Sequence, residues 1–472
     1  CNYNPATIMT DTSVADKVYM EPLNLEYLAK IIRYERPDAI VPGIGGQTGL
    51  NLAMQLEKKG VLRECGAELL GTSSRSIERA EDRELFKELC EEIGEPVLQS
   101  VIAESVEEGL KAAEDIGYPV VLRPAFTLGG TGGGFADGRE ECAEILRGAL
   151  ELSPVHQVLV EKSIKGYKEI EYEVMRDAND TAITICNMEN VDPVGIHTGD
   201  SIVVCPSQTL TNKEYHMLRD SALKIIRALK IEGGCNVQFA LDPLSFKYYL
   251  IEVNPRVSRS SALASKASGY PIARVSAKIS VGMHLDEIMI ANTPASFEPA
   301  LDYVVTKMPR FPFDKFSSAN NKLSTQMKAT GEVMSVGRTV EESLLKAARS
   351  LEIGVNHLYM KKFDGFTEDE MLAYIKDGTD DRIYAIAELL RRGTDVGMIC
   401  NATKIDMLFL EKISNIVRAE DKLKEHIGDI DTLYAAKRLG FSDEYIGRLW
   451  DMTGEEIFRI REKHNMFPVY KM

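Results

Sequence analysis

The sequence predicts an α/β protein that is followed by an all-helical C-terminal domain. Three observations support this fold class. Short apolar strands alternate with amphipathic helices over residues 17–153, and strands with a two-residue period follow over residues 157–190. From about residue 353, amphipathic helices with capping patterns replace the strands. The 472 residues are enough for about two to four domains with well-formed cores.

The composition, with 44% hydrophobic and 27% charged residues, is that of a globular protein. A net charge of −16 argues against a general nucleic-acid or anionic-membrane surface, so any anion site must be local. There is no run of 18 apolar residues and no signal-peptide pattern, so we expect no membrane partner. The eight cysteines form no C-x-x-C pair, which favours a cytoplasmic protein without a zinc site. The chain starts at Cys1 and resembles a piece of a longer protein.

The first α/β layer combines a glycine-rich turn with a following helix. We expect a helix over 26–36, a strand over 39–42, a loop over 43–49 and a helix over 50–59. Such a turn at a helix start is a possible phosphate site. An ordinary tight turn is the alternative interpretation.

A second α/β segment contains a loop with five glycines in seven positions, residues 128–134. We expect helices over 82–92 and 105–116 and a strand over 119–124 in front of this loop. Backbone N–H groups of such a loop can approach phosphate oxygens closely. The loop lacks the residues of a P-loop and of a dinucleotide fingerprint. It therefore predicts a hairpin flap over a ligand, with a merely flexible hairpin as the alternative.

The next strands, over 157–161, 169–175 and 182–186, place three glutamates on one strand face, Glu169, Glu171 and Glu173. Acidic stripes of this kind are usually solvated, and we expect this one to be solvated. A polar loop over 195–201 contains His197, and a lone histidine is more often structural than catalytic.

The strongest pattern lies around residues 236–259, after a helix expected over 212–229. Asn236 and Gln238 share one strand face, as do Glu252 and Asn254, and a turn over 242–245 joins the two strands into a hairpin. Their oxygen atoms suit one or two Mg²⁺ ions that bridge nucleotide phosphates. After Pro255, two arginines offer forked donors to a planar or phosphorylated anion. An ordinary strand end with a solvated salt bridge is the alternative.

The C-terminal part carries two capping boxes, Thr367-x-x-Glu370 and Thr453-x-x-Glu456. We expect helices over 369–376, 382–392, 404–422 and 443–452. No catalytic pattern is evident there, which favours a packing or association domain.

Six sequence runs together resemble, in order, the large chain of carbamoyl phosphate synthetase in the ATP-grasp superfamily. They are residues 4–11 (NPATIMTD), 45–48 (GGQT), 80–83 (AEDR), 123–130 (RPAFTLGG), 195–201 (GIHTGDS) and 252–261 (EVNPRVSRSS). The chain is similar to the first of the family's two synthetase halves. The resemblance implies a partial pre-ATP-grasp α/β domain at 1–80 and an ATP-grasp domain at 81–281. The C-terminal part of the synthetase unit follows at 282–352, and a helical oligomerisation domain at 353–472.

The resemblance also implies roles for individual residues. The phosphates of ATP would be held by Arg83 and Arg123 under Gly129 and Gly130. The adenine pocket would be lined by Lys162 and Ile164, the ribose hydroxyls would be bound by Glu169, and the nucleotide pocket would be completed by Gly195, Ile196 and His197. The metal ligands would be Gln238, Glu252 and Asn254, of which the first two would also contact ATP, and bicarbonate would be faced by Asn236, Arg256 and Arg259.

In the family, the first half phosphorylates bicarbonate with ATP, and ammonia converts the carboxyphosphate to carbamate. This reaction begins carbamoyl phosphate synthesis for arginine and pyrimidine biosynthesis. The implied cofactors are ATP and two Mg²⁺ or Mn²⁺ ions, with K⁺ as a further candidate. Because no glutaminase triad is evident, ammonia would come from a glutaminase small subunit or from solution. The C-terminal half of the large chain and further copies of this chain are the other expected partners.

Two other interpretations remain open. A biotin carboxylase resembles this fold and also uses bicarbonate, but it lacks the helical C-terminal domain. Alternatively, the chain is a catalytically incomplete fragment that serves as a subunit-association module, since the strand expected ahead of Asn4 is missing.

Overall fold

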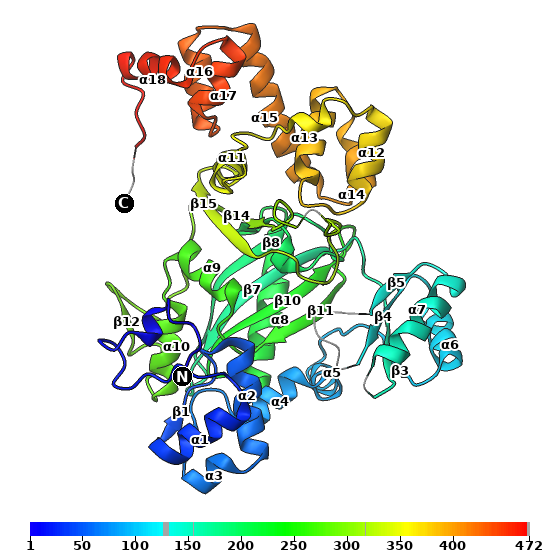
Figure 1. Ribbon diagram of the computed structural model, residues 1–472, viewed down its shortest axis with the longest axis vertical. Helices are drawn as coiled ribbons and strands as arrows, with labels where there is room; N and C mark the ends of the chain where they lie inside the picture. Colours follow the sequence, from blue (N-terminus) through cyan, green and yellow to red (C-terminus); the bar gives the residue numbers. More distant parts are fainter. Residues whose placement is uncertain (126–131, 154, 317, 470–472) are drawn as a thin grey trace.

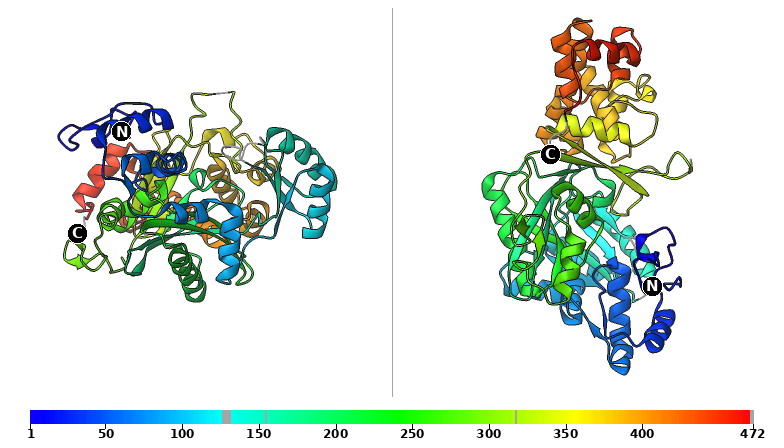
Figure 2. Two further views of the ribbon diagram at one scale, coloured as in Figure 1. Left: turned by 90° about the horizontal axis from the view of Figure 1, so that it is seen from below. Right: turned by 90° about the vertical axis from the view of Figure 1, so that its left-hand side faces the viewer.

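A computed structural model describes residues 1–125, 132–153, 155–316 and 318–469, and also leaves the side chain of Arg83 undescribed. A seven-stranded sheet occupies the middle of the molecule (Figure 1). The N-terminal layer lies at one end of the long axis and the C-terminal helices lie at the other, as the right-hand view of Figure 2 also shows. A smaller α/β lobe projects from the side of the central sheet.

The N-terminal layer is a pair of short parallel strands with three helices. Its elements are η1 (Ile8–Thr10), α1 (Leu25–Glu35), β1 (Ala39–Ile40), α2 (Gly46–Lys58), α3 (Val61–Cys65) and β2 (Glu68–Leu69). Helix α2 begins four residues before the predicted position. A Cβ atom on Gly49 would lie 2.7 Å from the Pro42 carbonyl oxygen, so glycine lets the first turn of α2 contact the end of the strand.

The side lobe is a four-stranded antiparallel sheet in the order β3-β6-β4-β5. Its strands are β3 (Ser100–Ala103), β4 (Val120–Pro124), β5 (Gly134–Ala136) and β6 (Val158–Lys162). Its helices are α6 (Val106–Ile116) and α7 (Arg139–Leu152), and α4 (Ser74–Glu81) and α5 (Arg83–Glu92) lead into it. The predicted hairpin is confirmed, because β5 pairs antiparallel with β4. Residues 126–131 of its loop lie outside the described residues.

The central sheet has the order β11-β10-β7-β8-β9-β14-β15. Its strands are β7 (Lys168–Arg176), β8 (Ala182–Asn190), β9 (Val203–Cys205), β10 (Gly233–Leu241), β11 (Tyr248–Asn254), β14 (Val304–Arg310) and β15 (Gly331–Gly337). The associated elements are η3 (Thr198–Asp200), α8 (Asn212–Leu229), α9 (Arg259–Ser268), α10 (Ile272–Ser280), β12 (Met289–Ile290) and β13 (Thr293–Pro294). Helix α8 packs on the apolar side chains of β7, whereas α9 contacts the opposite face through Ser261.

The C-terminal part is all-helical, as predicted. It contains α11 (Val340–Ser350), η4 (Lys361–Phe363), α12 (Glu368–Lys376), α13 (Arg382–Arg391), α14 (Val396–Thr403), α15 (Met407–Glu425), α16 (Ile430–Arg438), α17 (Asp443–Trp450) and α18 (Gly454–Lys463). Both capping boxes are present. The helix predicted from residue 404 begins at Met407 instead, because Lys404 adopts a left-handed conformation that ends α14. Among the helices of the described residues, none has the length and hydropathy that crossing a bilayer requires.

Candidate functional site

The predicted hairpin is formed by β10 and β11. Asn236 lies opposite Asn254 and Gln238 lies opposite Glu252, so the four side chains leave one face of the sheet. A register irregularity follows Gln238. Both amide residues of β10 are buried, whereas the Glu252 side chain is exposed. The hairpin therefore gathers one accessible carboxylate and three carboxamides.

A row of carboxylates from β7 lies beside this hairpin. Glu171 lies opposite Gln238, and Glu173 lies opposite Asn236. The prediction of a solvated stripe was wrong, because Glu169, Glu171 and Glu173 are only 5%, 2% and 0% exposed. The reason is that β7 is an interior strand of the sheet and that Ser261 of α9 covers its polar face.

Burial changes the ionisation of this row. Removal from water disfavours a carboxylate, and this effect raises the pKa of Glu169 and of Glu173 to about 8. The charge of Glu171 between them is the second cause that contributes to these raised pKa values. The site thus contains protonated carboxyl groups near neutral pH, next to the residues that would bind metal.

The side chain of Asn236 is fixed by the carboxyl row. Its Nδ2 donates to Glu171 Oε2 at 2.9 Å and to Glu173 Oε1 at 3.0 Å. The Ser261 hydroxyl donates to the other oxygen of Glu173 at 3.0 Å. Asn236 Oδ1 is buried and accepts no hydrogen bond from the residues that the structure describes. A buried acceptor without a donor is costly, so this oxygen favours a ligand that donates a hydrogen bond.

The two predicted arginines follow the hairpin. Arg256 donates from Nη2 to Asn254 Oδ1 at 2.9 Å and from Nε to Gln47 Oε1 at 2.6 Å. Arg259 is exposed at the first position of α9, and its Nη1 lies 3.4 Å from Met327 Sδ. Sequence reasoning did not assign Gln47 to the site, because its contact depends on a chain crossing that no local pattern encodes.

The loop over residues 195–201 lies against the same carboxyl row. The Thr198 hydroxyl donates to Glu171 Oε1 at 2.5 Å. His197 donates its backbone N–H to the Ser324 carbonyl at 2.7 Å, and its Nδ1 accepts from the Gly199 N–H at 2.9 Å. Burial lowers the pKa of His197, so the ring stays neutral near pH 7. These contacts give His197 a structural anchoring role in this loop.

The Lys307 side chain binds the backbone of this loop. Its Nζ donates to the carbonyl oxygens of Thr198, Gly199 and Ser201 at 3.1, 3.1 and 2.8 Å. Burial lowers the pKa of Lys307. Gly195 of the same loop has a φ of +127°, a conformation that favours glycine. A Cβ atom there would lie 3.7 Å from both Lys165 and Phe135, so the loop lies beside β5 of the side lobe.

The remaining predicted nucleotide residues have contacts in three places: the junction of the two sheets, the side lobe and the helical part. Ile164 is buried with Ala240 of β10, which joins the side lobe to the hairpin, and Ile196 contacts the position of Gly378. Lys162 Nζ donates to the Gly117 carbonyl at 2.7 Å, and Arg123 Nε lies 3.1 Å from Glu161 Oε2. The side chain of Arg83 and both predicted flap glycines, Gly129 and Gly130, lie outside the described residues.

The donor set of the hairpin fits a hard divalent cation. Gln238, Glu252 and Asn254 present only oxygen ligands from one sheet face, as Mg²⁺ prefers. The described residues contain no cluster of three or more His, Cys, Asp or Glu in a metal-binding arrangement. The donor set therefore mixes a carboxylate with carboxamides, and the oxygens of a phosphate ligand would complete the coordination of a metal held there.

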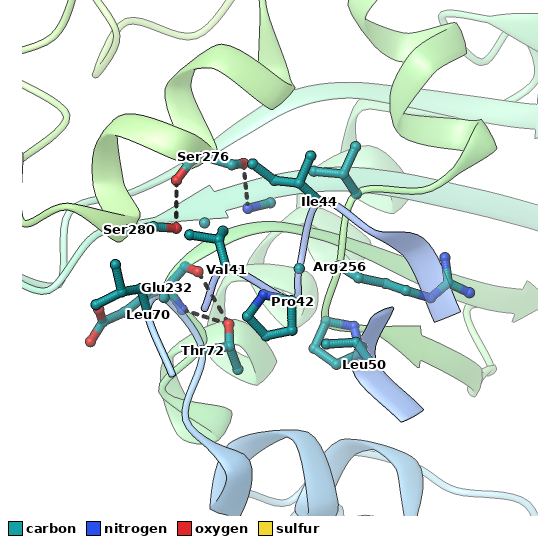
Figure 3. Close-up of a pocket in the computed structure, with 16 residues that line it drawn as sticks. Val41, Pro42, Ile44, Leu50, Leu70, Thr72, Glu232, Arg256, Ser276 and Ser280 are labelled. Carbon is teal, nitrogen blue, oxygen red and sulfur yellow. Dashed lines mark hydrogen bonds between the residues drawn. The ribbon is translucent and has the colours of Figure 1, made fainter. Parts of the chain in front are cut away.

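A small pocket lies between the N-terminal layer and the end of the hairpin, and residues of both line it (Figure 3). Thr72 exchanges hydrogen bonds with the backbone of Glu232, and the Ser276 hydroxyl accepts from the Gly234 N–H at 3.1 Å. Arg256 and Ile44 line the same pocket. Its volume of about 20 Å³ holds roughly one water molecule. This pocket is therefore a seam between domains and is too small for a nucleotide.

Comparison with solved structures identifies the fold. The biotin carboxylase domain of Hydrogenobacter thermophilus 2-oxoglutarate carboxylase, solved with MgADP, ADP and bicarbonate, superposes with a TM-score of 0.56. It is 18% identical, and the match covers 72% of this chain and 81% of that one. Biotin carboxylase from Campylobacter jejuni gives 0.55 at 16% identity, over 80% and 85% of the two chains. Rhizobium etli pyruvate carboxylase gives 0.50 at 21% identity over 60% of this chain, which spans only 25% of that protein. The shared fold is of the ATP-grasp type.

Models of three protein families match successive parts of the chain. The carbamoyl phosphate synthase preATP-grasp domain matches residues 1–79. The ATP-binding domain of the carbamoyl-phosphate synthase L chain matches residues 82–288, which contain the hairpin and the carboxyl row. The oligomerisation domain of the carbamoyl-phosphate synthetase large chain matches residues 332–465. Fold and family together support an ATP-dependent ligase. The chain belongs to the family of carbamoyl-phosphate synthetase large chains, and its three domains correspond to the N-terminal half of such a chain.

Proposed function

We propose that this chain phosphorylates bicarbonate with ATP and lets ammonia convert the product to carbamate. The observation that supports this proposal most is the pairing of Gln238 with Glu252 on a hairpin that Arg256 follows two residues after its last strand. An oxygen-rich metal site and an anchored guanidinium thus lie next to each other. Phosphoryl transfer to a small oxyanion requires this combination of charge neutralisation and anion positioning.

The proposed reaction has two steps. A bicarbonate oxygen attacks the γ-phosphorus of ATP, ADP leaves, and carboxyphosphate forms. The nitrogen of ammonia then attacks the carboxyl carbon, and phosphate leaves with the bonding electron pair to give carbamate. Arg256 and Arg259 would bind the bicarbonate, and the free Oδ1 of Asn236 would accept a hydrogen bond from bicarbonate or ammonia. The buried carboxyl row would limit access of water to the labile carboxyphosphate.

The nucleotide would lie along the junction of the two sheets. Arg83, Arg123, Gly129 and Gly130 would bind its phosphates, Lys162 and Ile164 its base, and Glu169 its ribose. Gly195, Ile196 and His197 would close the pocket, consistent with the contacts of their loop to the side lobe. Two Mg²⁺ or Mn²⁺ ions held by Gln238, Glu252 and Asn254 would neutralise phosphate charge, and K⁺ is a further candidate ion.

We further propose the partners and the place of this activity. A glutaminase subunit would supply the ammonia, and the C-terminal half of the large chain would consume the carbamate for arginine and pyrimidine synthesis. The helical residues 353–472 would associate with another copy of the chain. All eight cysteines are unpaired, which supports a reducing compartment such as the cytoplasm.

The test is ADP release by the purified chain with Mg·ATP, in the presence and absence of bicarbonate. We expect bicarbonate to stimulate turnover and Glu252→Gln to abolish the stimulation, because the substitution removes the accessible carboxylate of the metal site. Glu151→Gln, an exposed substitution on α7, is the matched control and should leave the stimulation unchanged. Turnover in Glu252→Gln equal to that of the unchanged chain would contradict the assignment of Glu252 as a metal ligand.

The same assay separates the alternatives. The likeness in fold to biotin carboxylases makes transfer of the carboxyl group to biotin the second candidate. Stimulation by free biotin but not by ammonia would favour that activity. Binding of Mg·ATP that raises the thermal stability without any turnover would favour an association module instead.

A further inference from the structure

The helical C-terminal part contains a surface hollow of about 500 Å³. The segment that follows α11 forms one wall, and residues of α17 form the other. The nucleotide residues assigned above all lie between positions 83 and 259, so the hollow shares none of them. Its volume falls in the range of pockets that bind small organic molecules.

Two cationic side chains line the hollow without an anionic partner among the described residues. Lys361 and Arg448 are exposed and make no ion pair within the part of the chain that the structure describes. Neighbouring cations are already paired, since Lys362 contacts Asp381 and Arg391 binds Glu420. One carboxylate, Glu444, also lines the hollow. The hollow therefore carries an excess of positive charge in a chain whose net charge is −16.

The hollow also has aromatic and apolar lining residues, and the ring of one of them, Tyr359, lies close to Arg448 and 5.8 Å from Arg391. The Arg448 guanidinium lies 4.1 Å from the centroid of the Tyr359 ring, and Met360 and Ile353 line the hollow beside it. The Tyr359 hydroxyl donates to Asp364 at 2.7 Å, which fixes the ring. An aromatic surface next to a guanidinium suits a flat ligand that bears a negative charge.

The floor of the hollow is rigid. The His357 ring stacks on Tyr445 with a centroid distance of 3.7 Å and an interplanar angle of 15°. His357 Nε2 lies 2.8 Å from Glu420 Oε1, and Arg391 binds the same carboxylate. A ligand would thus enter a preformed site and would not have to order its walls first.

We propose that this hollow binds a small aromatic anion, with a carboxylate or phosphate group on Lys361 and Arg448 and a ring against Tyr359 and Met360. Lys361 and Arg448 would bind the negative charge of the ligand, and the contacts with its ring would favour it over inorganic anions. The site would be separate from the nucleotide site and independent of the proposed reaction.

The test is isothermal titration of the complete 472-residue chain with phenyl phosphate, inorganic phosphate and phenol. We expect one saturable site for phenyl phosphate and binding at least roughly tenfold weaker for the other two, because each lacks one recognised group. Phenyl phosphate should bind equally well in saturating MgADP. The Lys361→Ala/Arg448→Ala double variant should weaken binding by at least roughly tenfold.

Arg438→Ala is the matched control, since Arg438 also faces a tyrosine ring, Tyr434 at 6.0 Å, but lies outside the hollow. It should bind phenyl phosphate as the unchanged chain does. Thermal unfolding of all variants separates lost binding from lost folding. Four results would each overturn the proposal. They are an affinity for inorganic phosphate equal to that for phenyl phosphate, displacement of phenyl phosphate by MgADP, and an unchanged affinity in a folded double variant. The fourth is no binding of phenyl phosphate at about 10 mM, a concentration well above ordinary site affinities.

Discussion

Arg256 donates a 2.6 Å hydrogen bond from Nε to the Oε1 of Gln47, a residue that precedes it by 209 positions. This contact joins the N-terminal layer to the end of the β10–β11 hairpin. Gln47 is in turn held by its Nε2, which donates to Glu81 at 2.8 Å and to Asn51 at 3.0 Å. The guanidinium that would face bicarbonate is therefore oriented by the N-terminal layer, and its other contact is Asn254, a residue of the proposed metal site.

We expect Gln47→Ala to impair bicarbonate use more than folding. Loss of a hydrogen bond to a charged group corresponds to about 1.5–3 kcal/mol, so the KM for bicarbonate should rise by roughly tenfold or more. Steady-state ADP release at varied bicarbonate measures this change. Gln55→Ala, an exposed position on the same helix, should leave the KM unchanged. An unchanged KM in Gln47→Ala would show that Arg256 does not need this partner.

Local sequence patterns predicted the hairpin because its chemistry has the two-residue period of a strand. The two-residue period predicted that Asn236 and Gln238 share one strand face, as Glu252 and Asn254 do. The register that places Asn236 opposite Asn254 depends on the irregularity after Gln238, which no local pattern predicted. The burial of Glu173 could not be predicted in the same way, since an alternating acidic strand has the same pattern whether water or a helix covers it. The covering group, Ser261, and the partner of Arg256, Gln47, come from distant segments that carry no local signal.

The buried Glu173 predicts a specific pH dependence of stability. Its pKa is about 8 in the folded chain, against a reference value of 4.5. Between these values the folded chain keeps a proton that the unfolded chain releases. The contribution of Glu173 therefore becomes less favourable to folding as the pH rises from about 4.5 to 8, by up to about 1.4 kcal/mol per pH unit.

Glu173→Gln removes this titration and should make the free energy of unfolding fall less steeply between pH 5 and pH 8. Urea unfolding at several pH values, with chelator and without nucleotide, measures the slope. Glu140→Gln, at an exposed position of α7, should reproduce the original slope. The same slope in Glu173→Gln would mean that this carboxyl is ionised throughout the range.

Lys307→Met should loosen the loop over residues 195–201. Three carbonyl oxygens lose their common donor, and an unsatisfied buried acceptor costs about 1–3 kcal/mol. We expect faster hydrogen exchange in this loop and an affinity for Mg·ATP at least roughly tenfold lower. Lys315→Met, at an exposed site, is the control. Faster exchange with an unchanged affinity for Mg·ATP would show that the loop does not contribute to nucleotide binding.

The buried carboxylate of Glu420 should stabilise the helical part of the chain. Burial raises the pKa of Glu420, but hydrogen bonds from Arg391 and His357 outweigh this effect and lower it to about 2. A carboxyl whose folded pKa lies below the reference value of 4.5 stabilises fully above pH 4.5, and the stabilisation is lost as the pH falls toward 2. Among the described residues, Glu420→Gln leaves the largely buried Arg391 guanidinium with only the longer ion-pair contact to Glu388 at 3.3 Å, and breaking a buried ion pair in this way costs up to roughly 3–5 kcal/mol. Thermal and urea unfolding near pH 7 should show this loss, and the difference from the unchanged chain should shrink below pH 4.5.

Glu425→Gln, at the exposed end of the same helix, should unfold as the unchanged chain does. If Glu420→Gln retained full stability at pH 7, the ion pair with Arg391 would contribute no net stabilisation to this domain.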